Sequence, residues 1–196
     1  MTRRQILKQI AVLLGGAISP PVVSAALSGS RPVAGAEAWQ PRTLSADQNR
    51  LVTALAELIL PATDTPGAMA AGVNEFIDLL LTDWLSDGEC QRFLAGLADL
   101  DASSRAQFDR AFLELTAAEQ MSLLEPLDVE SVDARVAAAR SGLQDVALPF
   151  FGMMKEMTIV GYYTSEVGIE HELEYDPYPG AYAGCVPFED AGRTRA

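Results

Sequence analysis

Apolar side chains recur every three or four residues through much of the chain, a spacing that predicts amphipathic helices. The first clear stripe follows a capping box of Ser45 and Gln48, ends before Pro61 and contains Leu51, Val52, Leu55, Leu58 and Ile59. The same spacing returns from Val73 to Trp84. We therefore expect two helices, each with one apolar face, that pack against each other.

Further helices are predicted from residues that cap helix ends. Ser86 begins a second capping box, and the helix that follows it is expected to reach about Asp101. Two shorter helices are predicted to begin at Ser104 and Thr116. Pro126 is expected to stop the second of them, because proline cannot continue a helix without the loss of a hydrogen bond.

The next segment, residues 127–145, is alanine-rich and acidic with a weak period, which predicts a loop followed by a helix. Pro149 suits the first position of a helix, and an aromatic and methionine stripe follows it at Phe150, Phe151, Met154 and Met157. Such a stripe usually belongs to a core, so we expect a central hydrophobic helix here. Beyond Glu166 the periodicity fails. The expected fold is all-α, a small domain of about five to seven helices with an extended, tyrosine-rich C-terminal tail.

These patterns divide the chain into four segments. We expect a signal peptide over residues 1–25, a linker over 26–43, the helical domain over 44–166 and the extended tail over 167–196. The tail is rich in proline, glycine and tyrosine, so it cannot bury much of itself. It either lies along its own domain or wraps another chain, a role that suits tyrosine because the ring is apolar and the hydroxyl is polar.

The N-terminus has the pattern of an export signal. Arg3 and Arg4 precede an apolar run of nine residues, Ile10–Ile18, which is too short for a bilayer because about 20 residues are needed to span one. Small residues follow, as is typical of a cleavage site. The paired arginines resemble a twin-arginine signal, which exports proteins that have already folded; an ordinary secretory signal is the alternative.

The composition is that of a globular protein, with 49% hydrophobic and 21% charged residues in a chain of 196. A chain of this length can form one domain with a real core. Its formal net charge of −13 disfavours nucleic acid and anionic lipid as partners, because like charges repel. A basic protein partner is compatible with this charge.

Residues that could carry catalysis or hold a cofactor are scarce. The single histidine, His171, lies between two glutamates, so we expect a solvated side chain and not a metal ligand. No glycine-rich nucleotide motif or Gly-x-Ser-x-Gly elbow occurs. For Cys90 and Cys185, an intrachain disulfide, an interchain disulfide and free thiols are all open. A solvated face and helix caps are expected to account for the carboxylates Glu57, Asp64, Glu75 and Asp78. We expect no catalytic, cofactor or metal site in this chain.

The most specified stretch, residues 58–68, joins the first two predicted helices. Pro61 ends the preceding helix, Pro66 and Gly67 fix a second turn, and Asp64 offers side-chain oxygens to backbone N–H groups. Turn chemistry alone can account for these residues. Recognition of another protein is the alternative interpretation.

This stretch, ELILPATDTPGA followed by GVNEF, resembles the hallmark of the gluconate 2-dehydrogenase subunit 3 family. Two later strings also resemble the family pattern: GYYTSE over residues 161–166 and YPGAYAGC over residues 178–185. Together with the signal, the resemblance spans nearly the whole chain. The family comprises small subunits of bacterial flavin-dependent sugar and alcohol dehydrogenase complexes.

The resemblance implies a non-catalytic small subunit that stabilises a flavoprotein and carries it to the periplasm through the twin-arginine translocase. The implied partners are a large GMC-type dehydrogenase subunit with bound FAD, which acts on a sugar, sugar acid or polyol, and a cytochrome c subunit. Through this complex the chain would be associated with the inner membrane. The expected partner interface comprises Pro61, Thr63, Asp64, Pro66, Gly67, Tyr162, Tyr163, Tyr178, Tyr182 and Cys185.

Two other functions are compatible with the sequence. One is a free-standing periplasmic helical binding or chaperone protein with no fixed partner. The other is an enzyme in its own right that uses His171, and it is the less favoured of the two.

Overall fold

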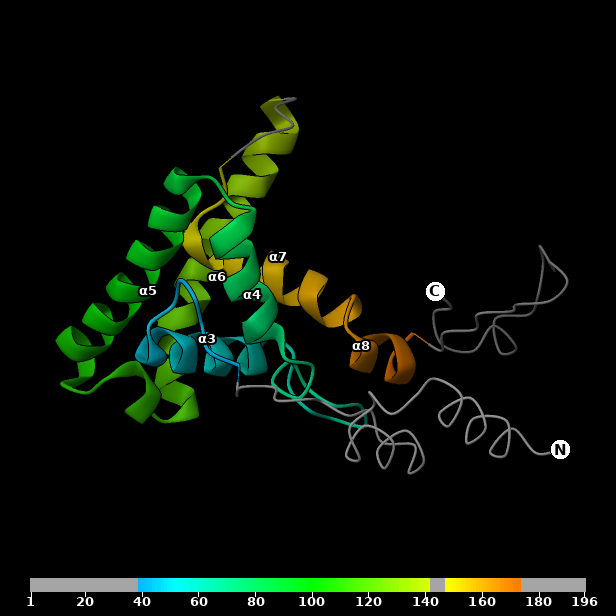
Figure 1. Cartoon of the computed structure of the whole chain (residues 1–196). Helices are drawn as coiled ribbons and strands as arrows, with labels where there is room; N and C mark the ends of the chain where they lie inside the picture. The colour runs from blue at the N-terminus through cyan, green and yellow to red at the C-terminus, as the bar shows by residue number, and fades with distance from the viewer. Residues whose placement is uncertain (1–38, 142–146, 174–196) are drawn as a thin grey trace, which may run out of the picture. The chain divides into compact units, whose positions relative to one another are not determined.

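The computed structural model describes residues 39–141 and 147–173, and these residues form helices and connecting loops without strands. The helices are α3 (Ala46–Ile59), α4 (Val73–Asp83), α5 (Asp87–Phe108), the 3₁₀ helix η1 (Phe112–Glu114), α6 (Ala117–Ser141), α7 (Phe150–Tyr163) and α8 (Glu166–His171) (Figure 1). All belong to one compact unit that begins at Pro41. The all-α prediction is confirmed for these residues, while most of the predicted tail lies outside them.

Helix α7 is the centre of this unit, because α3, α4, α5, α6 and α8 all pack against it. Its buried side chains include Phe151, Met153, Met154, Met157 and Tyr162. Burial of these large apolar groups is a main source of stability for the fold. The predicted central hydrophobic helix is therefore confirmed. Its first turn differs by one residue, because Pro149 is the N-cap and the helix begins at Phe150.

Helices α3 and α4 form the pair that the first two apolar stripes predict. Ser45 caps α3 through the full capping box with Gln48, and the buried side chains of both helices join one core. Trp84 departs from the prediction. It is the C-cap of α4 and its side chain is 82% exposed, so it does not continue the buried stripe.

Helix α5 is longer than predicted, because it continues past Asp101 to Phe108. Ser104, expected to start a new helix, is instead buried within α5 and donates a hydrogen bond of 2.7 Å to the carbonyl oxygen of Arg110. The helix ends at Asp109, whose left-handed backbone (φ 54°) reverses the chain. The predicted break at Ser104 is wrong because that hydroxyl satisfies the backbone of the following turn.

Helix α6 begins where predicted, with Thr116 and Glu119 exchanging hydrogen bonds at its start. Pro126 does not stop it, and the predicted loop after residue 126 is also wrong, because one helix runs on to Ser141. Pro126 lies on the exposed side of α6, where water can solvate the carbonyl group that loses its partner. On either side of it, Leu124 and Ser131 are buried, so packing holds the helix together across the proline.

Asp78, expected on a solvated face, is 1% exposed within α4. Its carboxylate accepts backbone hydrogen bonds from Arg42 at 2.7 Å, from Thr43 at 3.1 Å and from Leu44 at 2.8 Å. These bonds satisfy a buried charge that would otherwise be costly. They also fix the segment that leads into α3, so the predicted solvated role of Asp78 is wrong.

Candidate docking surface

The loop between α3 and α4, here called the corner loop (residues 60–69), is braced by one carboxylate. Glu57, on the last turn of α3, accepts a hydrogen bond of 3.0 Å from the backbone N–H of Ala62 and one of 2.8 Å from that of Met69. A single side chain therefore ties both ends of the loop to α3. A backbone bond of 2.9 Å from Ala68 to Leu60 closes the loop from the other side.

The inner side of the corner loop is attached to the C-terminal helices. The buried hydroxyl of Tyr162, on α7, donates a hydrogen bond of 2.7 Å to the carbonyl oxygen of Pro66. The hydroxyl of Thr65 donates one of 3.0 Å to the carboxylate of Glu172, just after α8. The loop thus has a fixed conformation before any partner binds, which lowers the entropic cost of binding.

Gly67 is required at its position by the close approach of its neighbours. A Cβ atom added there would lie 2.6 Å from the backbone nitrogen of Ala62 and would collide with the carboxylate of Glu57. A side chain at Gly67 would therefore displace the brace. The glycine permits contact between the loop and the carboxylate that holds it.

The outer side of the corner loop faces solvent. Pro61, Thr63 and Asp64 are exposed, and so is the thioether of Met69. The hydroxyl of Thr63 donates a hydrogen bond of 3.1 Å to the carboxylate of Asp64, so these two polar groups are held in one arrangement. A rigid loop with a mixed apolar and polar outer side has the features of a recognition element.

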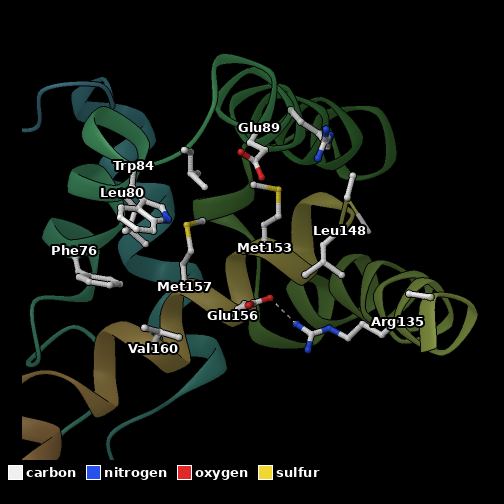
Figure 2. A pocket seen from close by; sticks show the side chains of 14 residues that line it. Phe76, Leu80, Trp84, Glu89, Arg135, Leu148, Met153, Glu156, Met157 and Val160 are labelled. Carbon is white, nitrogen blue, oxygen red and sulfur yellow. Dashed lines mark hydrogen bonds and ion pairs between the residues drawn. The ribbon is translucent and has the colours of Figure 1, made fainter. Parts of the chain in front are cut away.

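A groove of about 660 Å³ lies between α4, α5, α6 and α7 (Figure 2). Met153 and Met157 of α7 form part of its wall, and Phe76, Leu80 and Trp84 of α4 line one side. Figure 2 shows the indole of Trp84 on the α4 side of the groove, with the two methionine sulfurs directed toward the open space. Methionine side chains adapt to the shape of whatever packs on them, so this wall suits a protein partner.

Charged side chains of α5, α6 and α7 surround the groove. Arg135 and Glu156 form an ion pair of 3.3 Å at one end of it. On the α5 side, hydrogen bonds from the Ser86 hydroxyl and backbone hold the pKa of Glu89 below its usual value, and the charge of Arg92 acts in the same direction. An apolar wall within a charged margin is the usual organisation of a protein–protein interface.

Helices α4 and α7 connect the groove to the corner loop. Phe76 and Val160 lie at one end of the groove (Figure 2), and Tyr162, which holds the loop, follows Val160 on α7. The two helices are close here, because a Cβ atom added at Gly161 would lie 2.7 Å from the ring of Phe76. We treat the corner loop and the groove together as one candidate docking surface.

The predicted interface residues divide into three groups. Pro61, Thr63 and Asp64 are exposed on the corner loop, whereas Pro66 is half-buried and Gly67 is buried. Tyr162 is buried within the chain and Tyr163 is half-buried, with their rings 5.3 Å apart at 88°. The remaining predicted positions lie outside the described residues, as do those of the signal: Tyr178, Tyr182, Cys185, Arg3 and Arg4.

The residues considered for chemistry are dispersed. His171 is exposed at the end of α8, and Cys90 is half-buried on α5, where burial raises the pKa of its thiol. Within residues 39–141 and 147–173, no three His, Cys, Asp or Glu side chains are grouped so as to hold a metal ion. None of the helices described in these ranges has the length and apolar character needed to cross a membrane.

Three residues of the surface were missed from the sequence: Glu57, Met153 and Trp84. Glu57 had the appearance of a solvated helix residue, and its distance from Met69 along the chain gave no signal of contact. Met153 was omitted from the predicted stripe, and Trp84 was assigned to a buried face. The placement of all three depends on how α3, α4 and α7 pack.

Comparisons with known proteins give one match. The family model described as Gluconate 2-dehydrogenase subunit 3 matches residues 46–180, which include all the described helices. Neither the curated proteins nor the solved structures gave a match.

Proposed function

The chain belongs to the gluconate 2-dehydrogenase subunit 3 family, and on that premise we propose that it is the non-catalytic small subunit of a flavin-dependent dehydrogenase complex. Its partner is a large GMC-type subunit that binds FAD and oxidises a sugar, sugar acid or polyol. The family match carries this proposal. The exposed Trp84 beside a methionine-lined groove supports a binding role, because a large aromatic side chain in solvent is unfavourable until a partner covers it.

The flavoprotein contacts the corner loop and the groove. Trp84 is the central anchor, since tryptophan is enriched among the residues that contribute most to binding energy. The braced corner loop positions Thr63 and Asp64 for polar contacts at the margin. The last segment of the chain, residues 174–196, adds tyrosine contacts to the same partner.

Export follows from the N-terminal pattern. The pair Arg3 and Arg4 directs the folded complex through the twin-arginine translocase to the periplasm, and the flavoprotein travels with this subunit. A cytochrome c subunit then accepts the electrons and associates the complex with the inner membrane. The small subunit therefore stabilises and co-exports the enzyme.

Purification of the tagged chain from its native host tests the subunit assignment. We expect a yellow complex with flavin absorbance and a co-purifying dehydrogenase chain. A colourless, well-folded monomer that resists aggregation would contradict it and would favour a free-standing binding or chaperone protein.

Substitution of Trp84 tests the docking surface. Trp84→Ala should weaken association with the flavoprotein by about tenfold or more, whereas thermal stability should hardly change because the side chain is exposed. Leu79→Ala is the matched control, since Leu79 is an exposed apolar residue of α4 that does not line the groove. Equal effects of the two substitutions would place the interface elsewhere.

Two further variants test export and the tail. Replacement of Arg3 and Arg4 by lysine should leave both the small subunit and the flavoprotein in the cytoplasm; normal export of the flavoprotein would contradict co-export. Truncation after Leu173 should weaken association with the flavoprotein while helical content stays unchanged. Unchanged affinity would exclude residues 174–196 from the interface.

A further inference from the structure

The outer face of α6 carries an apolar stripe that no part of the described structure covers. Val129, Val132 and Val136 are 60%, 50% and 41% exposed, and they lie on the side of the helix opposite the buried Leu124 and Ser131. Valine is a poor choice for an exposed helix position, because its branched side chain loses freedom there without burying any surface. These three residues therefore have no explanation in the packing of α6 within the chain.

The stripe has the spacing of a short coiled-coil seam. Val129 and Val136 occupy a positions of a heptad, and Val132 and Ala139 occupy the d positions. We propose that this face of α6 pairs with the same face of a second copy of the chain, with the two helices antiparallel about a two-fold axis. In that arrangement Val132 packs on Val136 of the second copy, and Val129 packs on Ala139.

Charges beside the stripe select the second copy and its direction. Asp133 and Arg140 occupy e positions, and in an antiparallel pair each e residue faces an e residue of the other helix. Asp133 of one copy then faces Arg140 of the other, and the two-fold axis repeats this attraction. Within the described residues neither side chain forms an ion pair, so both are available.

The opposite flank favours the same direction. Asp128 and Arg135 occupy g positions, and an antiparallel pair places them opposite each other. A parallel pair would instead bring g residues against e residues, which sets Asp128 against Asp133 and Arg135 against Arg140. Both of these contacts are repulsive, so the charge pattern excludes a parallel dimer.

The face is accessible and separate from the groove. None of the three valines lines the groove, and in Figure 1 the last turns of α6, drawn in yellow-green, extend past the neighbouring helices. Asp128 and Arg135 bond to Lys155 at 2.7 Å and to Glu156 at 3.3 Å on α7, which fixes α6 beneath the seam. Self-pairing and flavoprotein binding can therefore occur on the same chain. The seam is short, so the dimer dissociates on dilution.

Sedimentation of the full-length chain at several concentrations tests the dimer and its charge pattern. Asp133→Arg places two arginines opposite each other twice across the axis, so dimerisation should weaken by about tenfold. The double variant Asp133→Arg/Arg140→Asp should restore it. Leu79→Asp is the control for non-specific association, since Leu79 is equally exposed but lies on α4. A monomer at every concentration, or a dimer that Asp133→Arg leaves unchanged, would overturn the proposal.

Cysteine cross-linking tests the direction independently. In a chain with Cys90 and Cys185 replaced by serine, a mixture of Val132→Cys and Val136→Cys chains should cross-link on mild oxidation far more than either variant alone. These positions are exposed, so the substitutions should leave folding intact, which circular dichroism would verify. Cross-linking that is strongest for Val132→Cys alone would indicate a parallel pair and overturn the antiparallel arrangement.

Discussion

The hydroxyl of Tyr162 donates a hydrogen bond of 2.7 Å to the carbonyl oxygen of Pro66, which lies 96 residues earlier in the chain. This bond joins the central helix α7 to the corner loop. Two strings that the sequence marks separately, the loop motif and GYYTSE, therefore meet in space. Tyr162 serves the candidate docking surface from inside the fold, since the buried hydroxyl sets the loop's position.

Loss of this hydroxyl should loosen the corner loop. Tyr162→Phe leaves the Pro66 carbonyl without its partner, so we expect the free energy of unfolding to fall by about 1 kcal/mol. Amide hydrogen exchange should rise in residues 60–69 before it rises elsewhere. Tyr163→Phe is the matched control, because its ring also packs in this pair and no hydrogen bond of its hydroxyl is found among the described residues. Equal effects of both variants would show that the bond to Pro66 has no special role.

Removal of the buried charge at Asp78 should destabilise the fold strongly. Asp78→Asn keeps the shape of the side chain but replaces one acceptor oxygen with a donor, which faces the N–H groups of residues 42–44. We expect a loss of about 2 to 3 kcal/mol in denaturant unfolding. The control is Asp83→Asn, which removes an exposed ion pair with Arg42 and should cost less than about 1 kcal/mol. Similar losses for both variants would contradict the role assigned to Asp78.

One substitution should stabilise the protein. Within the part of the chain that the structure describes, Thr158 carries the only buried side-chain polar atom without a hydrogen-bond partner. Thr158→Val replaces that hydroxyl by a methyl group of similar size, so we expect a gain of about 1 kcal/mol. Thr158→Ser keeps the hydroxyl and removes a methyl group, so it should destabilise. A lower melting temperature for the valine variant would indicate that a bound water or an undetected partner satisfies Thr158.

Two exposed capping carboxylates should make stability depend on pH. Hydrogen bonds from Ser86 lower the pKa of Glu89 in the folded chain, and those from Thr116 lower the pKa of Glu119. Each folded pKa lies below the unfolded value of 4.5, so the stabilisation is complete well above that pH and is lost as pH falls through the folded pKa.

Glutamine at both positions should reduce this dependence. It can occupy the same place in a capping box but does not titrate, so Glu89→Gln/Glu119→Gln should lose less stability than the unmodified chain between neutral pH and about pH 3. Denaturant unfolding at a series of pH values measures the difference. Identical pH profiles would show that these two caps do not contribute to acid sensitivity.

The helix starts at Ser45, Ser86 and Thr116 could be predicted because their signal is local. A capping box is completed within four residues, and an apolar stripe reports the face of the helix that carries it. The central helix after Pro149 was equally clear, since its aromatic and methionine residues leave no polar face. The corner loop could be located in the same way from its prolines and Gly67. These features fixed the all-α class and the family resemblance without knowledge of the packing.

Only the tertiary structure decided what each of the less local residues does. Ser104 and Pro126 carry signals that usually start or stop helices, yet packing on either side continues both α5 and α6. Asp78 and Trp84 exchange their expected environments, one buried as a carboxylate and the other exposed as an indole. Burial depends on which segments meet across the fold, and the hydrogen bonds that make a buried charge tolerable come from residues distant in the chain. The sequence alone therefore determined the helices, whereas packing determined the surface that they present.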